Sequence, residues 1–233
     1  MTSITLSEAW SGIADCRNCA LRATALFSGL GEQDFKRIHN PIKQHMFASG
    51  EFLYLNGDTG EDMFTIRKGL VKLVTRLPDG TQRIVRLLRS SDVCGLETLT
   101  GGTYHHDAIA LQHTEVCRFP TNLVKQLSLD NPKLYDELMG RWKMELEKAD
   151  LSLVEFSTGS ARHRVARFLL QLARDSDSEK IVLFSREDLG AVLGITTETA
   201  SRTIAEFKRQ GLIAESQPNH FLCDLPNLTR LLD

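Results

Sequence analysis

The stretch from Ser185 to Gly211 constrains the fold more than any other part of this chain, because it specifies two short helices joined by a tight turn. Ser185 and Asp188 form a capping pattern whose side chains can bond the free backbone amides of a first helical turn. Gly194 follows this helix, and glycine adopts the left-handed backbone conformation that a sharp turn requires. Thr196 is a suitable cap for a second helix, which Gly211 ends. We therefore expect a helix-turn-helix here.

Each of these two predicted helices has one apolar face. Residues three and four apart lie on the same side of a helix, so the two faces can pack against each other. The residues concerned are Leu189, Val192 and Leu193 in the first helix, and Ala200, Ile204 and Phe207 in the second. A β-hairpin predicted after them, turning near 218–220, fits the wing of a winged helix or simply closes the core of this small domain.

The second helix presents a polar face of a kind that reads DNA. Glu198, Ser201 and Arg202 lie on one side of it near its N-terminus. Arg202 can donate two hydrogen bonds to a guanine, Glu198 can accept one from a cytosine, and Ser201 can bond a base edge. The adjoining Thr197 and Thr199 complete the candidate DNA-binding set. The alternative is a solvated face with a Glu198–Arg202 salt bridge, which the complete surrounding motif disfavours.

A different pattern occupies the chain from about Phe47 to Pro120. Short apolar runs alternate there with corners such as Asn56-Gly57-Asp58 and Pro78-Asp79-Gly80. Evenly spaced strands with Gly, Asn and Asp at the corners are typical of an antiparallel β-sandwich or roll.

A long helix is predicted from about Pro132 to Glu155. One apolar stripe runs along it at steps of three and four residues, and comprises Leu134, Leu138, Trp142 (or Met139), Leu146, Ala149 and Leu153. Either this stripe packs only on the β-domain, or it pairs with its copy in a second chain. A long exposed stripe needs a partner. We therefore expect a homodimer whose interface contains Leu138, Trp142, Leu146, Ala149 and Leu153.

Composition limits the function classes. The formal net charge of −2 argues against a binder that depends on bulk positive charge, although it allows specific DNA binding through one positive face. Five cysteines, an odd number, disfavour a secreted disulfide framework. We find no secretory signal pattern or membrane-spanning run, so a cytoplasmic protein without membrane contact is expected. Paired carboxylates, a Ser-His-Asp order and a Gly-rich phosphate loop are all lacking, so we expect no enzyme.

The whole chain resembles the catabolite-activator/FNR (CRP/FNR) family of bacterial regulators. The most specific stretch is 194–202, whose Glu198-x-x-Ser201-Arg202 is similar to the FNR branch. The catabolite-activator branch would have arginine at Thr197 and glycine at Ser201. The resemblance implies an α+β fold with an N-terminal β-roll of the cyclic-nucleotide-binding type, a long dimerisation helix and a C-terminal winged helix-turn-helix.

The same resemblance implies a domain organisation and two partners. We expect a cysteine-containing sensor segment at 1–30, the β-roll at 31–131, the dimerisation helix and hinge at 132–158, and the DNA-binding domain at 159–233. Double-stranded DNA with palindromic TTGAT-type half-sites is the implied target. RNA polymerase is the implied protein partner, with the loop Pro78–Thr81 as a contact by family analogy.

The family's β-roll often binds a cyclic nucleotide, which requires an arginine to neutralise the buried phosphate. Here the region has Gly95-Leu96-Glu97 and then Tyr104-His105-His106-Asp107, without that arginine. We therefore expect no binding of cyclic AMP.

FNR-type oxygen sensors hold a [4Fe-4S] cluster with three N-terminal cysteines and one in the β-roll. Cys16, Cys19 and Cys117 match three of these positions, and Ala25 stands where the remaining ligand would be. Cys94 could replace it. The resemblance thus implies an iron–sulfur cluster as a possible cofactor, held by Cys16, Cys19 and Cys117 with Cys94 or a non-cysteine ligand.

Two other interpretations of the signal stay open. The thiols could form a reversible disulfide, or they could be inert while another ligand, such as haem, is sensed. A further alternative is a ligand-binding regulatory module without DNA activity. Ala149 also departs from FNR-type sensors, which have an acidic residue at the corresponding place of the dimer face. Charge repulsion there is reduced, which favours a dimer that persists in every sensor state.

Overall fold

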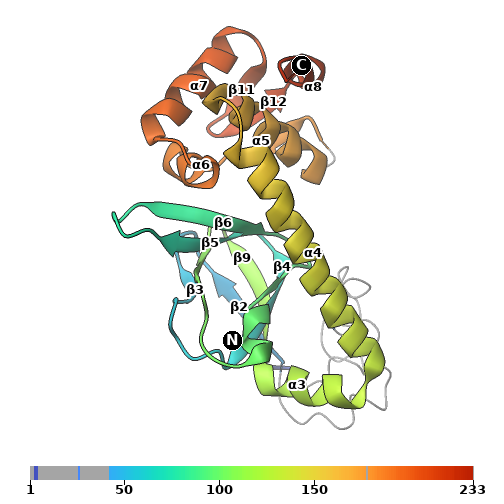
Figure 1. Ribbon diagram of the computed structural model, residues 1–233. Helices are drawn as coiled ribbons and strands as arrows, with labels where there is room; N and C mark the ends of the chain where they lie inside the picture. Colours follow the sequence, from blue (N-terminus) through green and yellow to red (C-terminus); the bar gives the residue numbers. More distant parts are fainter. Residues whose placement is uncertain (1–2, 5–25, 27–41, 177, 233) are drawn as a thin grey trace. The chain divides into compact units, whose positions relative to one another are not determined.

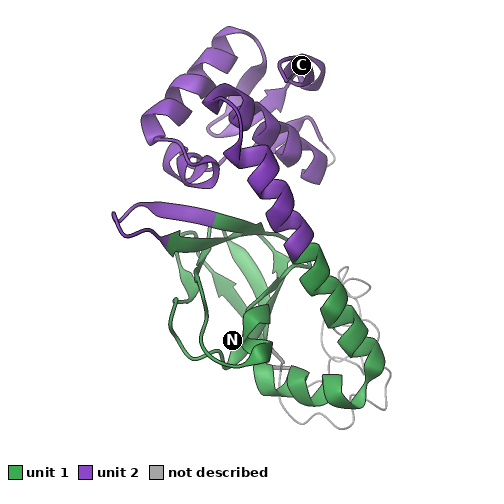
Figure 2. Ribbon diagram, in the orientation of Figure 1, with its two compact units in different colours: residues 1–75, 85–145 green, residues 76–84, 146–233 purple. Residues whose placement is uncertain are grey.

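The computed structural model describes residues 3–4, 26, 42–176 and 178–232. Two compact units divide the chain (Figure 2). Unit 1 comprises residues 1–75 and 85–145, and unit 2 comprises residues 76–84 and 146–233. In the described part of the chain, no helix is long and apolar enough to cross a membrane.

Unit 1 is built around an antiparallel β-roll (Figure 1). One sheet has the order β1-β2-β9-β4-β7 and the other the order β3-β8-β5-β6. Their bounds are β1 Ser3–Ile4, β2 Ile42–Phe47, β3 Phe52–Tyr54, β4 Asp62–Lys68, β5 Val71–Arg76, β6 Gln82–Leu88, β7 Val93–Cys94, β8 Asp107–Ala110 and β9 Thr114–Pro120. The predicted β-roll is therefore confirmed.

Gly69, between β4 and β5, shows why the corners of the roll are glycine-rich. Its φ is 110°, which an L side chain rarely adopts, and a Cβ there would lie 2.4 Å from the Thr114 side chain. Only glycine allows the chain to reverse at this place against β9.

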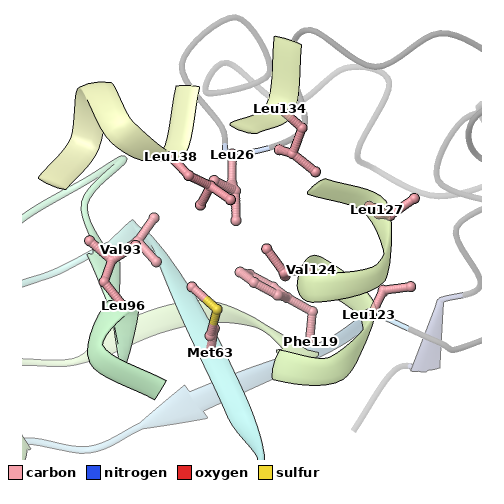
Figure 3. Packing of buried hydrophobic residues seen from close by; sticks show 10 residues of the cluster. All are labelled: Leu26, Met63, Val93, Leu96, Phe119, Leu123, Val124, Leu127, Leu134 and Leu138. Carbon is pink, nitrogen blue, oxygen red and sulfur yellow. The ribbon is translucent and has the colours of Figure 1, made fainter. Parts of the chain in front are cut away.

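Strand β4 is buried on both faces and separates two apolar cores. Phe64 and Ile66 face the interior of the roll, where they pack with Tyr54 and Tyr104. Met63 belongs to the second core, which also contains Leu26, residues of α3 (Thr121–Asp130) and the start of α4 (Pro132–Ser157). Figure 3 shows ten residues of this second core, which come from several elements that are distant in the sequence.

Helix α4 has 26 residues, which corresponds to about 39 Å. It begins beside Asn131, whose side-chain oxygen accepts hydrogen bonds from the amides of Lys133 and Leu134 at 3.1 and 3.3 Å. Its last turn is followed by Gly159 with a φ of 82°. The helix ends there because glycine tolerates the left-handed conformation that reverses the chain.

Unit 2 contains a winged helix. Its further elements are α5 Ala161–Ser176, β10 Lys180–Val182, α6 Arg186–Leu193, α7 Thr197–Arg209, β11 Ile213–Gln217, β12 His220–Cys223 and α8 Leu225–Arg230. A three-stranded sheet has the order β10-β12-β11, and its β11–β12 hairpin turns at Asn219 with a positive φ of 62°. The predicted helix-turn-helix and the following hairpin are confirmed.

Candidate functional site

The helix-turn-helix is held by the caps that the sequence specifies. The amide of Asp188 donates to the Ser185 hydroxyl at 3.0 Å, and the amide of Thr199 donates to the Thr196 hydroxyl at 3.2 Å. Gly194 ends α6 with a φ of 62°. These local bonds start both helices and set the sharp turn between them.

Gly190 determines how closely α6 approaches the turn. A Cβ at this position would lie 2.6 Å from the carbonyl oxygen of Ile195, a distance that side chains do not tolerate. Glycine is therefore required where the two helices meet. The apolar faces of α6 and α7 are buried as predicted, with Leu189, Ile204 and Phe207 almost entirely shielded.

The polar face of α7 is open to solvent. Thr197, Glu198, Ser201 and Arg202 are all exposed. Among the described residues, no ion pair joins Glu198 to Arg202, so both groups remain available. Thr199 is only half-exposed, because its hydroxyl accepts from that of Thr196 at 3.0 Å. Its place is in the cap of the helix, so the outward set is the other four residues.

Two arginines of α5 brace the helix-turn-helix. Arg162 is paired with Glu206, donates to Gln210 at 2.7 Å and lies over the ring of Phe207. Arg164 donates to the carbonyl oxygen of Leu193, at the C-terminus of α6, at 2.8 Å. Sequence reasoning did not identify this bracing, since the bonds join residues 29 to 48 positions apart.

Helix α4 packs on its own unit through a different face from the one expected. Leu138, predicted at the dimer interface, is only 3% exposed and lies in the second core of unit 1 with Leu134. It has no surface left for a partner, and that prediction is wrong. Glu145, expected off the apolar stripe, is 7% exposed and pairs with Arg86 of β6 at 3.4 Å. The ion pair allows a carboxylate to be buried there.

A second apolar stripe of α4 stays on the surface. Leu146 and Leu153, predicted at the dimer interface, are each 64% exposed. Tyr135 and Met139 are also exposed, whereas Trp142 and Ala149 are half-buried. These six residues, which we call the α4 stripe, recur at steps of four and three, the spacing of a two-helix seam: Tyr135, Met139, Trp142, Leu146, Ala149 and Leu153.

The candidate sensor thiols are separated by the strand register. Cys16, Cys19 and Ala25 lie outside the described residues. Thr65 of β4 is paired with Cys117, whereas the preceding residue, Phe64, is paired with Cys94. Successive residues of a strand point to opposite faces. Cys94 therefore faces the interior of the roll, and Cys117 packs against the second core.

This arrangement contradicts the prediction that Cys94 completes a set of metal ligands with Cys117. The two thiols lie on opposite sides of one sheet, so a single metal group cannot bind both. Burial also raises the pKa of the Cys94 thiol well above its usual range, which keeps it protonated. Cys223, in the wing, is buried as well, and its pKa is raised to about 11.

Cys117 is half-buried beside the core that contains Leu26. Within the described residues, no group of three or more His, Cys, Asp or Glu side chains could hold a metal ion. Of the candidate sensor thiols in the described part, Cys117 is the one on this side of the sheet. Leu26, fully buried among Met63, Leu134 and Leu138, fixes one point of the N-terminal segment against the start of α4 (Figure 3).

Three aromatic side chains pack in the interior of the roll. The rings of Tyr54 and Tyr104 stack with centroids 3.8 Å apart, and Phe64 lies against Tyr54. At the expected nucleotide cassette, Glu97 accepts from the amide of His105 at 3.5 Å. The short 3-10 helix Leu96–Thr100 follows Gly95.

Comparison with known proteins agrees with this architecture. Residues 44–131 match the cyclic nucleotide-binding domain family, and residues 163–231 match the Crp-like helix-turn-helix domain family. The transcriptional activator protein Anr of Pseudomonas aeruginosa is 30% identical over 217 residues, covering 90% of this chain and 89% of that protein. The fumarate and nitrate reduction regulatory protein of Salmonella typhi is 26% identical over 206 residues, covering 85% of this chain and 82% of that protein.

Among solved structures, FixK2 from Bradyrhizobium japonicum superimposes with a TM-score of 0.75 at 25% identity, over 82% of this chain and 96% of that one. The matching helix-turn-helix family and these relatives define the class of the protein as a DNA-binding transcription regulator. The chain belongs to the CRP/FNR family of transcription regulators. Membership in this family implies DNA binding and dimer formation.

Proposed function

We propose that this protein is a homodimeric regulator that binds a palindromic operator through α7 and responds to redox state or oxygen through Cys16, Cys19 and Cys117. The observation that supports it most strongly is the exposed face formed by Glu198, Ser201 and Arg202 on a capped, braced helix. Its DNA target would place it in the cytoplasm.

The half-site follows from the chemistry of that face. Arg202 is suited to the O6 and N7 acceptors of a guanine, and Glu198 to the amino group of a cytosine. A TTGAT half-site offers one G·C pair for this combination, and Ser201 is placed to contact a neighbouring base. Thr197, also exposed, lies at the edge of the same face.

The dimer would form through the α4 stripe. Its apolar side chains recur with the period of a coiled-coil seam, and four of the six are exposed in the single chain. Ala149 places no charge in this seam. The dimer therefore persists in every sensor state, and the signal acts by shifting the α4 helices within it, which reorients the DNA-binding units that follow them.

The sensor would combine the two N-terminal thiols with Cys117. Cys19 and Leu26 are seven residues apart, a stretch that can span at most about 25 Å. Leu26 and Cys117 border the same core, which also contains Leu134 and Leu138 of α4. A chemical change at these thiols would therefore alter the packing of this core against α4, the helix that would form the dimer.

Two chemistries fit these three cysteines. In the first, Cys16, Cys19 and Cys117 hold an iron–sulfur cluster whose remaining ligand is not a cysteine, and the cluster supplies sensitivity to oxygen when bound. In the second, two of the three thiols form a reversible disulfide. Cys94 is excluded as a fourth ligand of the cluster. This exclusion favours the disulfide, because a disulfide needs no fourth ligand.

Cyclic AMP is not the proposed effector. The aromatic stack of Tyr54 and Tyr104 occupies the interior of the roll, and the cassette has no arginine to pair with a phosphate. The loop Pro78–Thr81 is the proposed contact with RNA polymerase. Its turn is closed by the amide of Leu77 donating to the carbonyl oxygen of Thr81 at 2.8 Å.

An absorption spectrum of the protein purified without air, with assays of iron and acid-labile sulfide, tests the sensor. A broad band near about 400 nm that bleaches in air, with both elements present, is expected for the cluster. Cys117→Ala removes this band, whereas the matched control Cys94→Ala retains it. An iron-free, colourless protein whose Cys117 becomes oxidised in air supports the disulfide instead. Iron without sulfide, or three thiols that air leaves unchanged, would refute both.

A further inference from the structure

The turn at Ser157–Ser160, where the expected segment of dimerisation helix and hinge ends, is braced. Arg167 of α5 donates from Nη1 to the carbonyl oxygens of Glu155 and Thr158, at 3.1 and 2.9 Å. Its Nε also lies 3.7 Å from a carboxylate oxygen of Glu155. One guanidinium thus binds a carbonyl group in the last turn of α4 and another just beyond its end.

Two further contacts hold the same corner. The Thr158 hydroxyl donates to the carbonyl oxygen of Val154 at 2.6 Å. The ring of Phe156 packs edge-on against Phe168 of α5, with centroids 5.4 Å apart. Gly159 adopts its left-handed conformation within this set of contacts. The end of α4 is therefore attached to α5 by charge, hydrogen bonds and apolar packing together.

Helix α5 is in turn attached to the helix that reads DNA. Arg162, five residues before Arg167, pairs with Glu206 and bonds Gln210 at the end of α7. Both connections lie within unit 2, which includes α4 from Leu146 onward. The direction of α7 is thus fixed relative to the second half of α4. This half contains Leu146 and Leu153 of the α4 stripe.

We propose that Arg167 is a positioning residue that sets the distance and angle between the two α7 helices of the dimer, and so the half-site spacing that the protein accepts. This inference rests on the proposed function, since it needs a dimer on a palindromic operator. Arg167 itself touches no base. It acts by keeping the α4–α5 corner rigid, so that a seam between two α4 helices dictates where both α7 helices lie.

Rigid spacing has a measurable consequence. Inserting two base pairs between half-sites rotates one of them by about 70° around the duplex and moves it by about 7 Å. A rigid dimer cannot follow this change and loses one set of contacts. A dimer whose α4–α5 corner is flexible adapts better to the new spacing. It binds more weakly, however, because the corner loses conformational entropy each time the dimer binds DNA.

The test compares operators that differ only in their spacer. The operator is first selected from random DNA with the unaltered protein, and affinities are measured by fluorescence anisotropy at one salt concentration. For the unaltered protein we expect the two-base-pair insertion to weaken binding by about 30-fold. For Arg167→Ala we expect a penalty of about threefold, with binding to the selected operator itself weakened several-fold.

Matched variants separate positioning from general damage. Arg174→Ala removes an exposed arginine from the same helix and keeps the full spacing penalty. Arg167→Lys keeps the charge but cannot bond two carbonyl groups with one planar fork, so its penalty is intermediate. If Arg167→Ala fails to fold, this lysine variant decides the question. For the Arg167 variants we expect the same fraction of dimer, and the same affinity for a duplex with a single half-site, as for the unaltered protein.

The outcomes distinguish the two levels of the proposal. A full spacing penalty in the folded Arg167 variant, or an equal loss for one and two half-sites, would overturn the positioning role. If the unaltered protein selects no two-part operator, the proposed function fails instead.

Discussion

Replacing Arg202 with alanine is expected to abolish specific operator binding while the fold stays intact. Arg202 is exposed on α7, and none of the structural hydrogen bonds described for unit 2 depends on it. A bidentate contact to guanine contributes about 1–3 kcal/mol of discrimination, and a dimer makes two of them. Affinity should therefore fall by about 30-fold or more, measured by fluorescence anisotropy at fixed salt.

Arg209→Ala is the matched control for this variant, since it removes an exposed arginine from the same helix. Arg209 lies in the last turn of α7, so any phosphate contact there would lower affinity about equally for all sequences. Arg202→Ala should lower affinity for the operator and leave non-specific binding nearly unchanged. An operator affinity within about threefold of the unaltered protein would contradict the assignment of Arg202 to base contact.

Replacing Leu146 with glutamate is expected to convert the dimer into a monomer. Leu146 is 64% exposed in the single chain and lies in the middle of the α4 stripe. In a dimer, two carboxylates would be buried at the centre of an apolar seam, at a cost of several kcal/mol. The dimer should be weakened at least about 100-fold, which sedimentation velocity at micromolar concentration detects.

Met144→Glu is the control for the dimer. Met144 is 49% exposed and is apolar, but it lies two positions before Leu146, a rotation of about 200° that places it on the far side of α4. This variant should remain dimeric. Since Ala149 introduces no repulsion, the unaltered protein should sediment as a dimer with and without air. Dissociation by both glutamates, or by neither, would show that the seam lies elsewhere.

The helix-turn-helix was predictable because its signals are local. Ser185, Gly194 and Thr196 act on backbone groups within four residues, so their type and order already specify caps and a turn. The glycine corners of the roll work in the same way. Family resemblance then supplied the order of these elements along the chain, and the structure confirmed it.

The proposed dimer face was only partly predictable, because α4 has two adjoining apolar stripes. Leu134 and Leu138 belong to the stripe that covers unit 1, whereas Tyr135 and Met139 belong to the outer one. A period of three and four residues fits both. Which stripe is buried depends on contacts with α3 and β4, and these are distant in the sequence.

The candidate sensor cysteines Cys94 and Cys117 show the same limit in a sheet. Whether Cys94 and Cys117 share a face depends on the pairing of β4 with β7 and β9, and a shift by one residue reverses it. Sequence spacing does not determine this register. The burial of Glu145 was also not predicted, because its partner Arg86 is 59 residues away in the sequence.

Selection of bound sequences from a pool of random duplex DNA tests the central claim most directly. With the unaltered protein, the account predicts enrichment of a two-fold symmetric site whose TTGAT-type half-sites lie about one helical turn apart. Enrichment of no sequence, or of a single site without symmetry, would contradict a dimeric regulator that reads DNA through Glu198, Ser201 and Arg202.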